Sequence, residues 1–217
     1  LTYQRYLLLK NARQLEVSNQ ADWVKEKIQT VVSNAQATTQ TLGFIIEKNG
    51  VPKDFDRVSK ALLKTNKYID AVQLVEGGII THVYPQKGNE GVIGYNILSD
   101  TIANRGAYTA IKKREFFLAG PIKLKQGGAG FVGRWPIFKN NKFWGFSAVI
   151  IKLPTLLKAA GIDTASNNSF SYQLANVDAD TRKEEFFLPD HRSLEKGYSV
   201  PVEIPNGEWK LYVVSEK

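Results

Sequence analysis

The sequence predicts an α+β protein in which one long N-terminal helix is followed by two lobes built on antiparallel sheets, the second lobe being the smaller. Residues 3–48 contain no proline and a single glycine, which favours one uninterrupted helix. Runs rich in aromatic and β-branched residues follow, separated by short turns, which indicates antiparallel strands. A polar stretch at residues 163–168 divides these runs. We therefore expect the long helix over residues 1–48, a first lobe over 49–162 and a second lobe over 163–217.

The long helix carries apolar or small residues in steps of four and three. A spacing of about 3.5 residues is typical of a helix packed along another surface or helix. Leu8, Ala12 and Leu15 lie out of register with the later positions, so the first part of the helix is expected to have a different partner. Two alternatives stay open: the helix lies only on the sheets of its own chain, or its N-terminal part also forms a homodimer. The stripe consists of Val17, Ala21, Val24, Ile28, Val31, Ala35, Thr38, Leu42 and Ile45.

The first lobe is predicted to contain four antiparallel strands arranged as two hairpins. Glu76-Gly77-Gly78 forms the turn of the first hairpin, and Lys139-Asn140-Asn141-Lys142 forms that of the second. A helical crossover over about residues 101–114 joins them, and short helices are expected after Asp54 and over residues 154–160. The second lobe is predicted to be nearly all β. The predicted strands cover residues 68–75, 79–84, 131–138 and 143–151 in the first lobe, and 170–177, 186–188, 198–204 and 209–214 in the second.

The composition excludes several classes of protein. Among 217 residues, 43% are hydrophobic and 23% charged, an ordinary balance for a folded globular chain that excludes wholesale disorder. The absence of cysteine excludes disulfides, cysteine nucleophiles and thiolate metal sites. No apolar run approaches the roughly 18–20 residues that cross a bilayer. A piece cut from between two membrane helices fits these features, and so does a cytosolic domain.

The net charge of +8 has two interpretations. A basic chain can bind nucleic acid or an anionic membrane surface. However, the densest clusters, Lys112-Lys113-Arg114 and Lys139 with Lys142, are too short for a binding tract. We therefore favour scattered, solvated basic residues and expect no nucleic-acid partner. A soluble basic protein that binds nucleic acid or an acidic partner is the alternative function.

No constellation of residues predicts catalysis or metal binding. The two histidines, His82 and His191, are far apart and have no metal-ligand spacing. No Gly-x-Ser-x-Gly elbow occurs. Gly127-Gly128-Ala129-Gly130 lacks the Lys-Ser/Thr that a phosphate loop requires, and predicts a tight turn into a strand instead. We expect no enzymatic activity, metal or cofactor.

An ordered set of short motifs between residues 84 and 138 resembles the CHASE domain, an extracytoplasmic sensor module of histidine kinases and nucleotide cyclases. No single motif is specific, but their order within the stretch of about seventy residues from Val83 to Leu153 is the main evidence from the sequence for function. The motifs are Tyr84-Pro85, Gly88-Asn89, Gly94-Tyr95-Asn96-Ile97-Leu98, Arg105, Ala107 with Ala110, Leu118-Ala119-Gly120-Pro121 and Trp135-Pro136-Ile137-Phe138.

The resemblance implies PAS-like lobes, the second membrane-proximal, in a periplasmic or extracellular domain of an inner- or plasma-membrane receptor. It implies flanking transmembrane helices, a small-molecule ligand and a cytoplasmic histidine kinase or diguanylate cyclase. The family often has Asp where Asn96 stands, and in the plant cytokinin-receptor branch that acid holds the purine. A cytokinin-like ligand is therefore not carried over to this chain.

The first lobe is expected to hold the ligand cavity. Gly133, Gly145 and Ala148 keep the aromatic sheet thin, which leaves room for a ligand. The alternative is that these small residues only relieve crowding in a curled sheet. Asn96 is expected either to anchor the ligand or to cap the turn into Ile97. The predicted ligand-binding residues are Leu74, Asn96, Leu118, Phe131, Gly133, Trp135 and Phe146.

Overall fold

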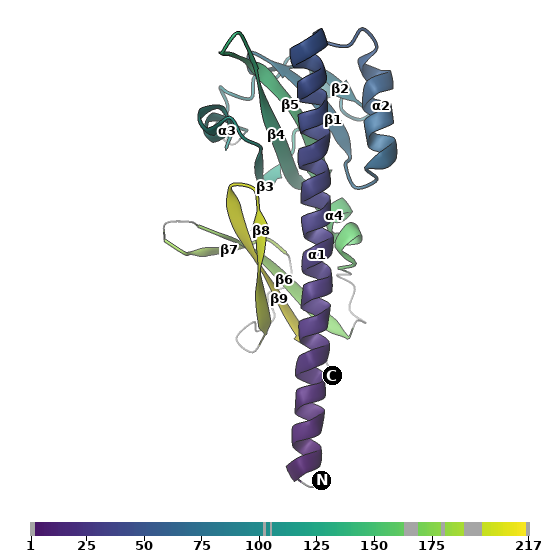
Figure 1. Cartoon of the computed structure of the whole chain (residues 1–217), viewed down its shortest axis with the longest axis vertical. Helices are drawn as coiled ribbons and strands as arrows, with labels where there is room; N and C mark the ends of the chain where they lie inside the picture. Colours follow the sequence, from purple (N-terminus) through teal and green to yellow (C-terminus); the bar gives the residue numbers. More distant parts are fainter. Residues whose placement is uncertain are drawn as a thin grey trace. The chain divides into compact units, whose positions relative to one another are not determined.

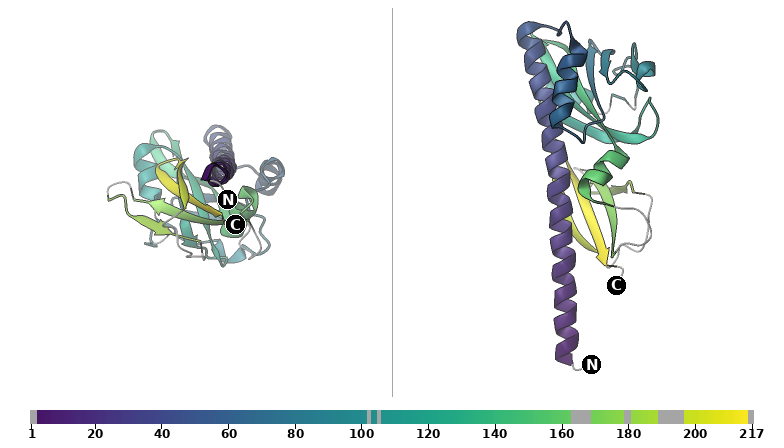
Figure 2. Two further views of the ribbon diagram at one scale, coloured as in Figure 1. Left: turned by 90° about the horizontal axis from the view of Figure 1, so that it is seen from below. Right: turned by 90° about the vertical axis from the view of Figure 1, so that its right-hand side faces the viewer.

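The computed structural model describes residues 3–101, 103–104, 106–162, 169–178, 181–188 and 197–215 (Figures 1 and 2). The chain divides into two compact units. Unit 1 comprises residues 1–30 and 157–217, and unit 2 comprises residues 31–156. The long helix contributes to both units, which sequence patterns do not reveal. The polar stretch at 163–168 lies outside the described residues, so the predicted lobe boundaries stay a prediction.

The N-terminal helix α1 spans Tyr3–Asn49, as predicted. Every position of the predicted stripe is buried except Ile45, whose place in the core is taken by Ile46. An α-helix turns once every 3.6 residues, so a straight helix drifts away from a repeat of about 3.5. Gly50 ends the helix with φ +77° and donates its N–H to the Ile46 carbonyl at 2.9 Å, which is a left-handed cap.

Unit 2 is built on a five-stranded antiparallel sheet in the order β2-β1-β5-β4-β3. Both predicted hairpins are confirmed, β1 with β2 and β4 with β5. The helix expected over 101–114 is shorter and begins at Ala107. The elements of unit 2 after α1 are α2 (Phe55–Thr65), β1 (Ala71–Glu76), β2 (Ile79–Tyr84), η1 (Glu90–Val92), α3 (Ala107–Lys113), β3 (Phe117–Lys123), β4 (Ala129–Lys139) and β5 (Lys142–Lys152).

Strand β3 is the element that the sequence pattern did not predict. Gly120 and Pro121 lie in its middle, where such residues usually argue against a strand. The pairing of β3 with β4 is irregular between Ala119 and Ile122, which accommodates both residues. Gly120 has φ +132°, and a Cβ there would lie 2.7 Å from the Gly130 carbonyl oxygen, so only glycine fits.

The two faces of this sheet are covered differently. The part of α1 after Thr30 runs along one face (Figure 1). There, Ser147 Oγ donates to the Thr39 carbonyl at 2.6 Å, and a Cβ on Gly43 would lie 2.7 Å from Trp135 Cδ1. The opposite face carries an apolar cluster that includes Ala71, Val75, Ile80, Val132, Phe146, Ala148 and Ile150.

Unit 1 contains a four-stranded antiparallel sheet in the order β7-β6-β9-β8. Its largest buried side chain is Trp209, and Gln20 on α1 donates to the Tyr172 hydroxyl at 2.7 Å. No described helix is both long and apolar enough to cross a membrane. The remaining elements are α4 (Leu153–Ala160), which begins in unit 2, and β6 (Phe170–Val177), β7 (Glu184–Phe186), β8 (Tyr198–Ile204) and β9 (Gly207–Ser215) in unit 1.

Candidate functional site

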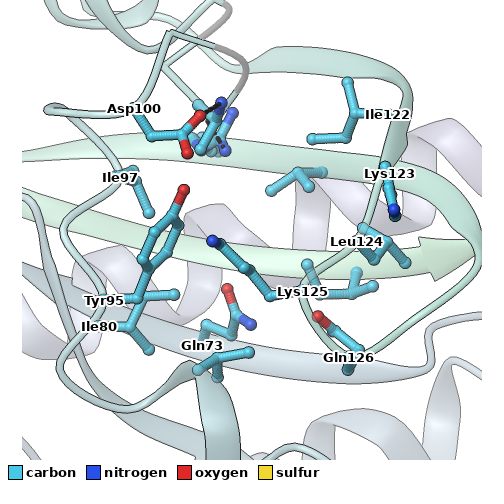
Figure 3. A pocket seen from close by; sticks show the side chains of 15 residues that line it. Gln73, Ile80, Tyr95, Ile97, Asp100, Ile122, Lys123, Leu124, Lys125 and Gln126 are labelled. Atoms are coloured by element: carbon cyan, nitrogen blue, oxygen red, sulfur yellow. Dashed lines mark hydrogen bonds between the residues drawn. The ribbon is translucent and has the colours of Figure 1, made fainter.

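Unit 2 encloses a cavity of about 330 Å³ on the sheet face opposite α1 (Figure 3). Cavities of this size accommodate small organic molecules. More than half of the lining side chains are apolar, and the polar ones come from the sheet, from the loop after β2 and from the β3–β4 turn. The lining residues are Gln73, Ile80, Val92, Tyr95, Ile97, Asp100, Ala103, Ile122, Lys123, Leu124, Lys125, Gln126, Val132, Arg134 and Ile150.

The floor of the cavity is set by the register of three strands. Gln73 on β1 pairs with Ala148 on β5, which in turn pairs with Arg134 on β4. These residues therefore lie in one row across the sheet, with the small Ala148 between two long polar side chains. Gln73 is 4% exposed and Arg134 is 3% exposed.

Arg134 is a buried cation that also holds Ala103, in the loop before α3, at the cavity. Its Nη2 donates to the Ala103 carbonyl at 2.8 Å. Burial lowers the pKa of Arg134 to about 10, and the neighbouring Tyr95 opposes this shift. The side chain nevertheless stays positively charged at neutral pH.

Tyr95 reaches the cavity from the loop after β2. Backbone bonds hold it beside that strand: the Ile80 N–H donates to the Tyr95 carbonyl at 3.0 Å, and the Gly94 N–H donates to the Ile80 carbonyl at 2.8 Å. In Figure 3 the Tyr95 hydroxyl points toward Asp100. Burial, together with the hydrogen bond to Asp100 and its charge, raises the pKa of Tyr95 to about 12, so the phenol stays protonated.

The turn between β3 and β4 forms the opposite wall. It is closed by the Leu124 N–H donating to the Gly128 carbonyl at 2.9 Å and by the Gly127 N–H donating to the Leu124 carbonyl at 3.0 Å, which confirms the predicted tight turn. The turn presents Gln126 to the cavity. Lys125 extends across the cavity, with Nζ 4.3 Å from the centroid of the Tyr95 ring.

One amide group at this cavity has no hydrogen-bond partner among the described residues: Gln126 Nε2, which is fully buried. An unpaired buried amide costs about 1–3 kcal/mol, so this group is expected to be satisfied by water or by a ligand. The buried side chain of Gln73 offers a second amide at the cavity. The arrangement supplies directed polar contacts inside an apolar shell.

The structure does not bring the seven predicted site residues together around this cavity. Leu74, Leu118, Phe131, Gly133 and Trp135 lie on the α1 side of the sheet, as the pairing of Leu74 with Ser147, of Ser147 with Trp135 and of Leu118 with Gly133 requires. The thin part of the sheet is filled from within the protein, since a Cβ on Gly133 would lie 2.7 Å from Phe116. A ligand role for these residues stays a prediction.

The other two predicted residues are close to the cavity but do not line it. Phe146 is fully buried in the apolar cluster, with its ring centroid 4.9 Å from that of Phe143. Asn96 is exposed, and its Oδ1 accepts the Leu98 N–H at 3.0 Å, which is the turn-capping alternative. The lining residues are the neighbours of predicted ones: Gln73 precedes Leu74, Tyr95 precedes Asn96, and Arg134 lies between Gly133 and Trp135.

Among the described residues, His82 takes no part in this cavity. The Nδ1 atom of His82 lies 3.0 Å from Thr81 Oγ1, and the His82 ring packs on the ring of Phe55. His191 and Arg105 lie outside the described residues. Within the described ranges, no group of three or more His, Cys, Asp or Glu side chains could hold a metal ion.

A family model for the CHASE domain matches residues 75–187, more than half of the chain. The chain belongs to the CHASE domain family. This confirms the resemblance read from the motifs, and it places the chain in the periplasm or outside the cell as a domain of a membrane receptor. No curated protein sequence matches the chain.

Solved structures share the fold at low sequence identity. The ligand-binding domain of the Pseudomonas fluorescens chemoreceptor CtaA in complex with L-isoleucine has a TM-score of 0.67 and 16% identity, over 99% of this chain and 96% of that one. The extracellular domain of the proposed histidine kinase soHK1S-Z6 has a TM-score of 0.66 and 12% identity, over 98% and 97%.

An extracellular ligand-binding receptor from Desulfohalobium retbaense has a TM-score of 0.67 and 13% identity, over 91% of this chain, and the chain spans only 40% of that receptor. The predicted fold class, a long helix followed by two antiparallel-sheet lobes, is thereby confirmed as that of sensor ligand-binding domains.

Proposed function

We propose that this CHASE domain is the sensor of a membrane receptor, and that it binds a small molecule in the cavity of unit 2. The observation that carries the proposal is the buried Gln126 Nε2, which has no hydrogen-bond partner among the described residues, at a cavity of about 330 Å³ whose lining is more than half apolar. Buried polar groups without partners are rare in folded proteins and are typical of sites that a ligand completes.

The proposal includes an output domain on the other side of the membrane. A sensor histidine kinase is the output that we favour, and a diguanylate cyclase is the second choice. Transmembrane helices flanking the domain belong to the same proposal. The similarity to the extracellular domain of soHK1S-Z6 and to chemoreceptor domains supports a transmembrane receptor of this general kind. The domain itself is proposed to bind its ligand without transforming it.

A homodimer through the first part of α1 is also proposed. Residues 3–16 are all exposed, and several of them are large and apolar. Exposed apolar patches on a folded chain favour association with another surface. Nucleic acid is not among the proposed partners, since several basic side chains are paired within the chain, as Arg182 is with Glu208 and Lys210 is with Glu184.

Blocking the cavity tests the proposed function. Ala103 lines the cavity from the partly exposed loop, so Ala103→Phe is expected to fill it without disturbing the sheet. A metabolite screen by thermal shift on the parent domain identifies the ligand. At a hundredfold excess over Kd, binding adds about 2.7 kcal/mol to the free energy of unfolding, or about 5–10 °C in Tm. This shift should be lost in Ala103→Phe.

The matched control is Ala129→Phe, because Ala129 is exposed at the start of β4 and does not line the cavity. The control should keep the full ligand-induced shift. An equal shift in Ala103→Phe would place the ligand elsewhere, and the residues predicted on the α1 side of the sheet would then be the next candidates.

A further inference from the structure

We propose that the ligand of this cavity is a small organic acid, with an apolar body against the aliphatic wall and a carboxylate beside Lys125 and Arg134. The inference rests on the proposed function and adds the chemical class of the ligand. It is carried by the charges at the cavity and by the direction of its hydrogen-bonding groups. Both are independent of what the structural relatives bind.

The charges around the cavity are unbalanced. Among the described lining residues, Lys123, Lys125 and Arg134 are three cations and Asp100 is the one acid. Arg134 remains cationic when buried and Tyr95 remains neutral, as their pKa values of about 10 and about 12 require. A bound anion therefore reduces the net charge at the cavity, whereas a bound cation increases it.

The polar groups at the cavity are mainly hydrogen-bond donors. Gln126 presents a buried Nε2 that donates to no described residue. Gln73 can both donate and accept, and the lysines and Arg134 can only donate. The single carboxylate, Asp100, already accepts the Ala103 N–H at 2.8 Å and the Tyr95 hydroxyl. A ligand rich in acceptor oxygens matches this set, and an ammonium group does not.

The apolar part of the lining indicates the chemistry of the rest of the ligand. Ile80, Ile97, Val132 and Ile150 supply a branched aliphatic wall opposite the polar groups. A cavity of about 330 Å³ holds a body of several carbon atoms, and burying each methylene contributes to affinity. Inorganic anions such as phosphate leave this wall uncovered, so the acid is expected to be organic.

Matched probes with one carbon skeleton test this inference. We would titrate the domain with 4-methylpentanoate, 4-methylpentanamide, 4-methylpentylamine and leucine, and with phenylacetate, phenylacetamide and phenethylamine, using calorimetry and thermal shift. The acids are expected to bind, the neutral amides more weakly and the amines not at all. Leucine adds an ammonium group to the skeleton of 4-methylpentanoate and is expected to bind more weakly than that acid.

Two variants locate the carboxylate and the polar anchor. Lys125→Gln removes one charge and should weaken binding of the acid up to about fivefold, and Gln73→Leu removes a hydrogen bond and should weaken it about tenfold. The control is Lys139→Gln. Lys139 also lies over an aromatic ring, with Nζ 3.9 Å from the centroid of Trp144, but it does not line the cavity. It should leave the affinity unchanged.

The outcomes separate this inference from the proposed function. If an amine or amide binds the parent as tightly as the matching acid does and fails to bind Ala103→Phe, the proposed ligand class is wrong. The proposed function of the cavity as the sensor site is then still supported. Acids whose affinity is the same in the parent, Lys125→Gln and Gln73→Leu also overturn it. Failure of every acid to bind the parent overturns it as well, and the metabolite screen then decides the proposed function separately.

Discussion

At the scale of single residues, Glu184 on β7 shows how a carboxylate is held in unit 1. It accepts a hydrogen bond from the Tyr212 hydroxyl and one from Lys210 Nζ at 2.9 Å, and the Phe186 ring packs near that of Tyr212. Burial alone would raise the pKa of Glu184, but these hydrogen bonds and the nearby positive charges outweigh it, so the pKa is lowered.

The lowered pKa predicts a pH dependence of stability. A carboxylate with a lower pKa in the folded state stabilises the protein above its unfolded-state pKa, and this contribution is lost as the pH falls through the folded-state value. Glu184→Gln should therefore lower the free energy of unfolding by about 1 kcal/mol at pH 7 and by much less near pH 3. Urea denaturation at both pH values measures this difference. The exposed Glu203→Gln serves as the control, and an equal loss at both pH values would contradict the prediction.

Asn96 has two competing roles that its variants separate. Its Oδ1 accepts the Leu98 N–H, which is a turn-capping bond, and the predicted alternative is a contact with the ligand. Asn96→Asp keeps the acceptor, whereas Asn96→Leu removes it and should cost about 0.5–1.5 kcal/mol of stability. If Asn96 only caps the turn, both variants should bind the ligand as tightly as the parent does. Titration calorimetry checks this, and weaker binding by both variants would support the ligand contact.

At the scale of elements, the sequence predicts most helices and strands but not the element that completes the sheet. The run from Phe131 to Ile151 has the alternation and β-branched residues of a hairpin, and it forms one. Strand β3 contains Gly120-Pro121, whose local preference for a turn is overridden by pairing with β4. Pairing between distant segments is not encoded in a local pattern, so it cannot be recognised there.

The same limit explains why the predicted site lies on the other face of the sheet. Alternation places Phe131, Gly133 and Trp135 together, but it does not say whether a helix or a ligand covers them. In the structure α1 takes that face, and its only glycine, Gly43, lies against Trp135. The cavity residues Gln73, Tyr95 and Arg134 are polar and lie next to predicted site residues in the sequence. An arginine within the apolar strand β4 was the sequence feature that could have indicated a site on the opposite face of the sheet.

The close contact between α1 and the sheet predicts a large effect at Gly43. A Cβ there would lie 2.7 Å from Trp135 Cδ1 and 3.2 Å from Ser147 Oγ. Gly43→Leu should lower the free energy of unfolding by about 1–3 kcal/mol, because the overpacked helix is forced away from the sheet. Urea denaturation measures the change. Thr41→Leu, at an exposed position of the same helix, should stay within about 0.5 kcal/mol of the parent. A neutral Gly43→Leu would mean that α1 does not pack here.

At the scale of the whole molecule, the described residues leave the first part of α1 uncovered. Tyr3, Leu8 and Leu15 are 75%, 69% and 63% exposed. Leu8 and Leu15 are seven residues apart and therefore lie on one face of the helix, with Ala12 between them. A helical segment with an exposed apolar face is marginal alone, and packing against the second copy that we propose would stabilise it.

The double variant Leu8→Lys/Leu15→Lys tests the proposed dimer. Each dimer would then carry four charges in its apolar seam, so the variant should sediment as a monomer at concentrations where the parent is a dimer. Its free energy of unfolding should differ little from that of the parent monomer, because both side chains are exposed in the single chain. Ile93→Lys, which also places a lysine at an exposed apolar residue but lies in unit 2, should leave the dimer intact. A parent that sediments as a monomer throughout the concentration series, or a double variant that stays dimeric, would rule out association through this segment.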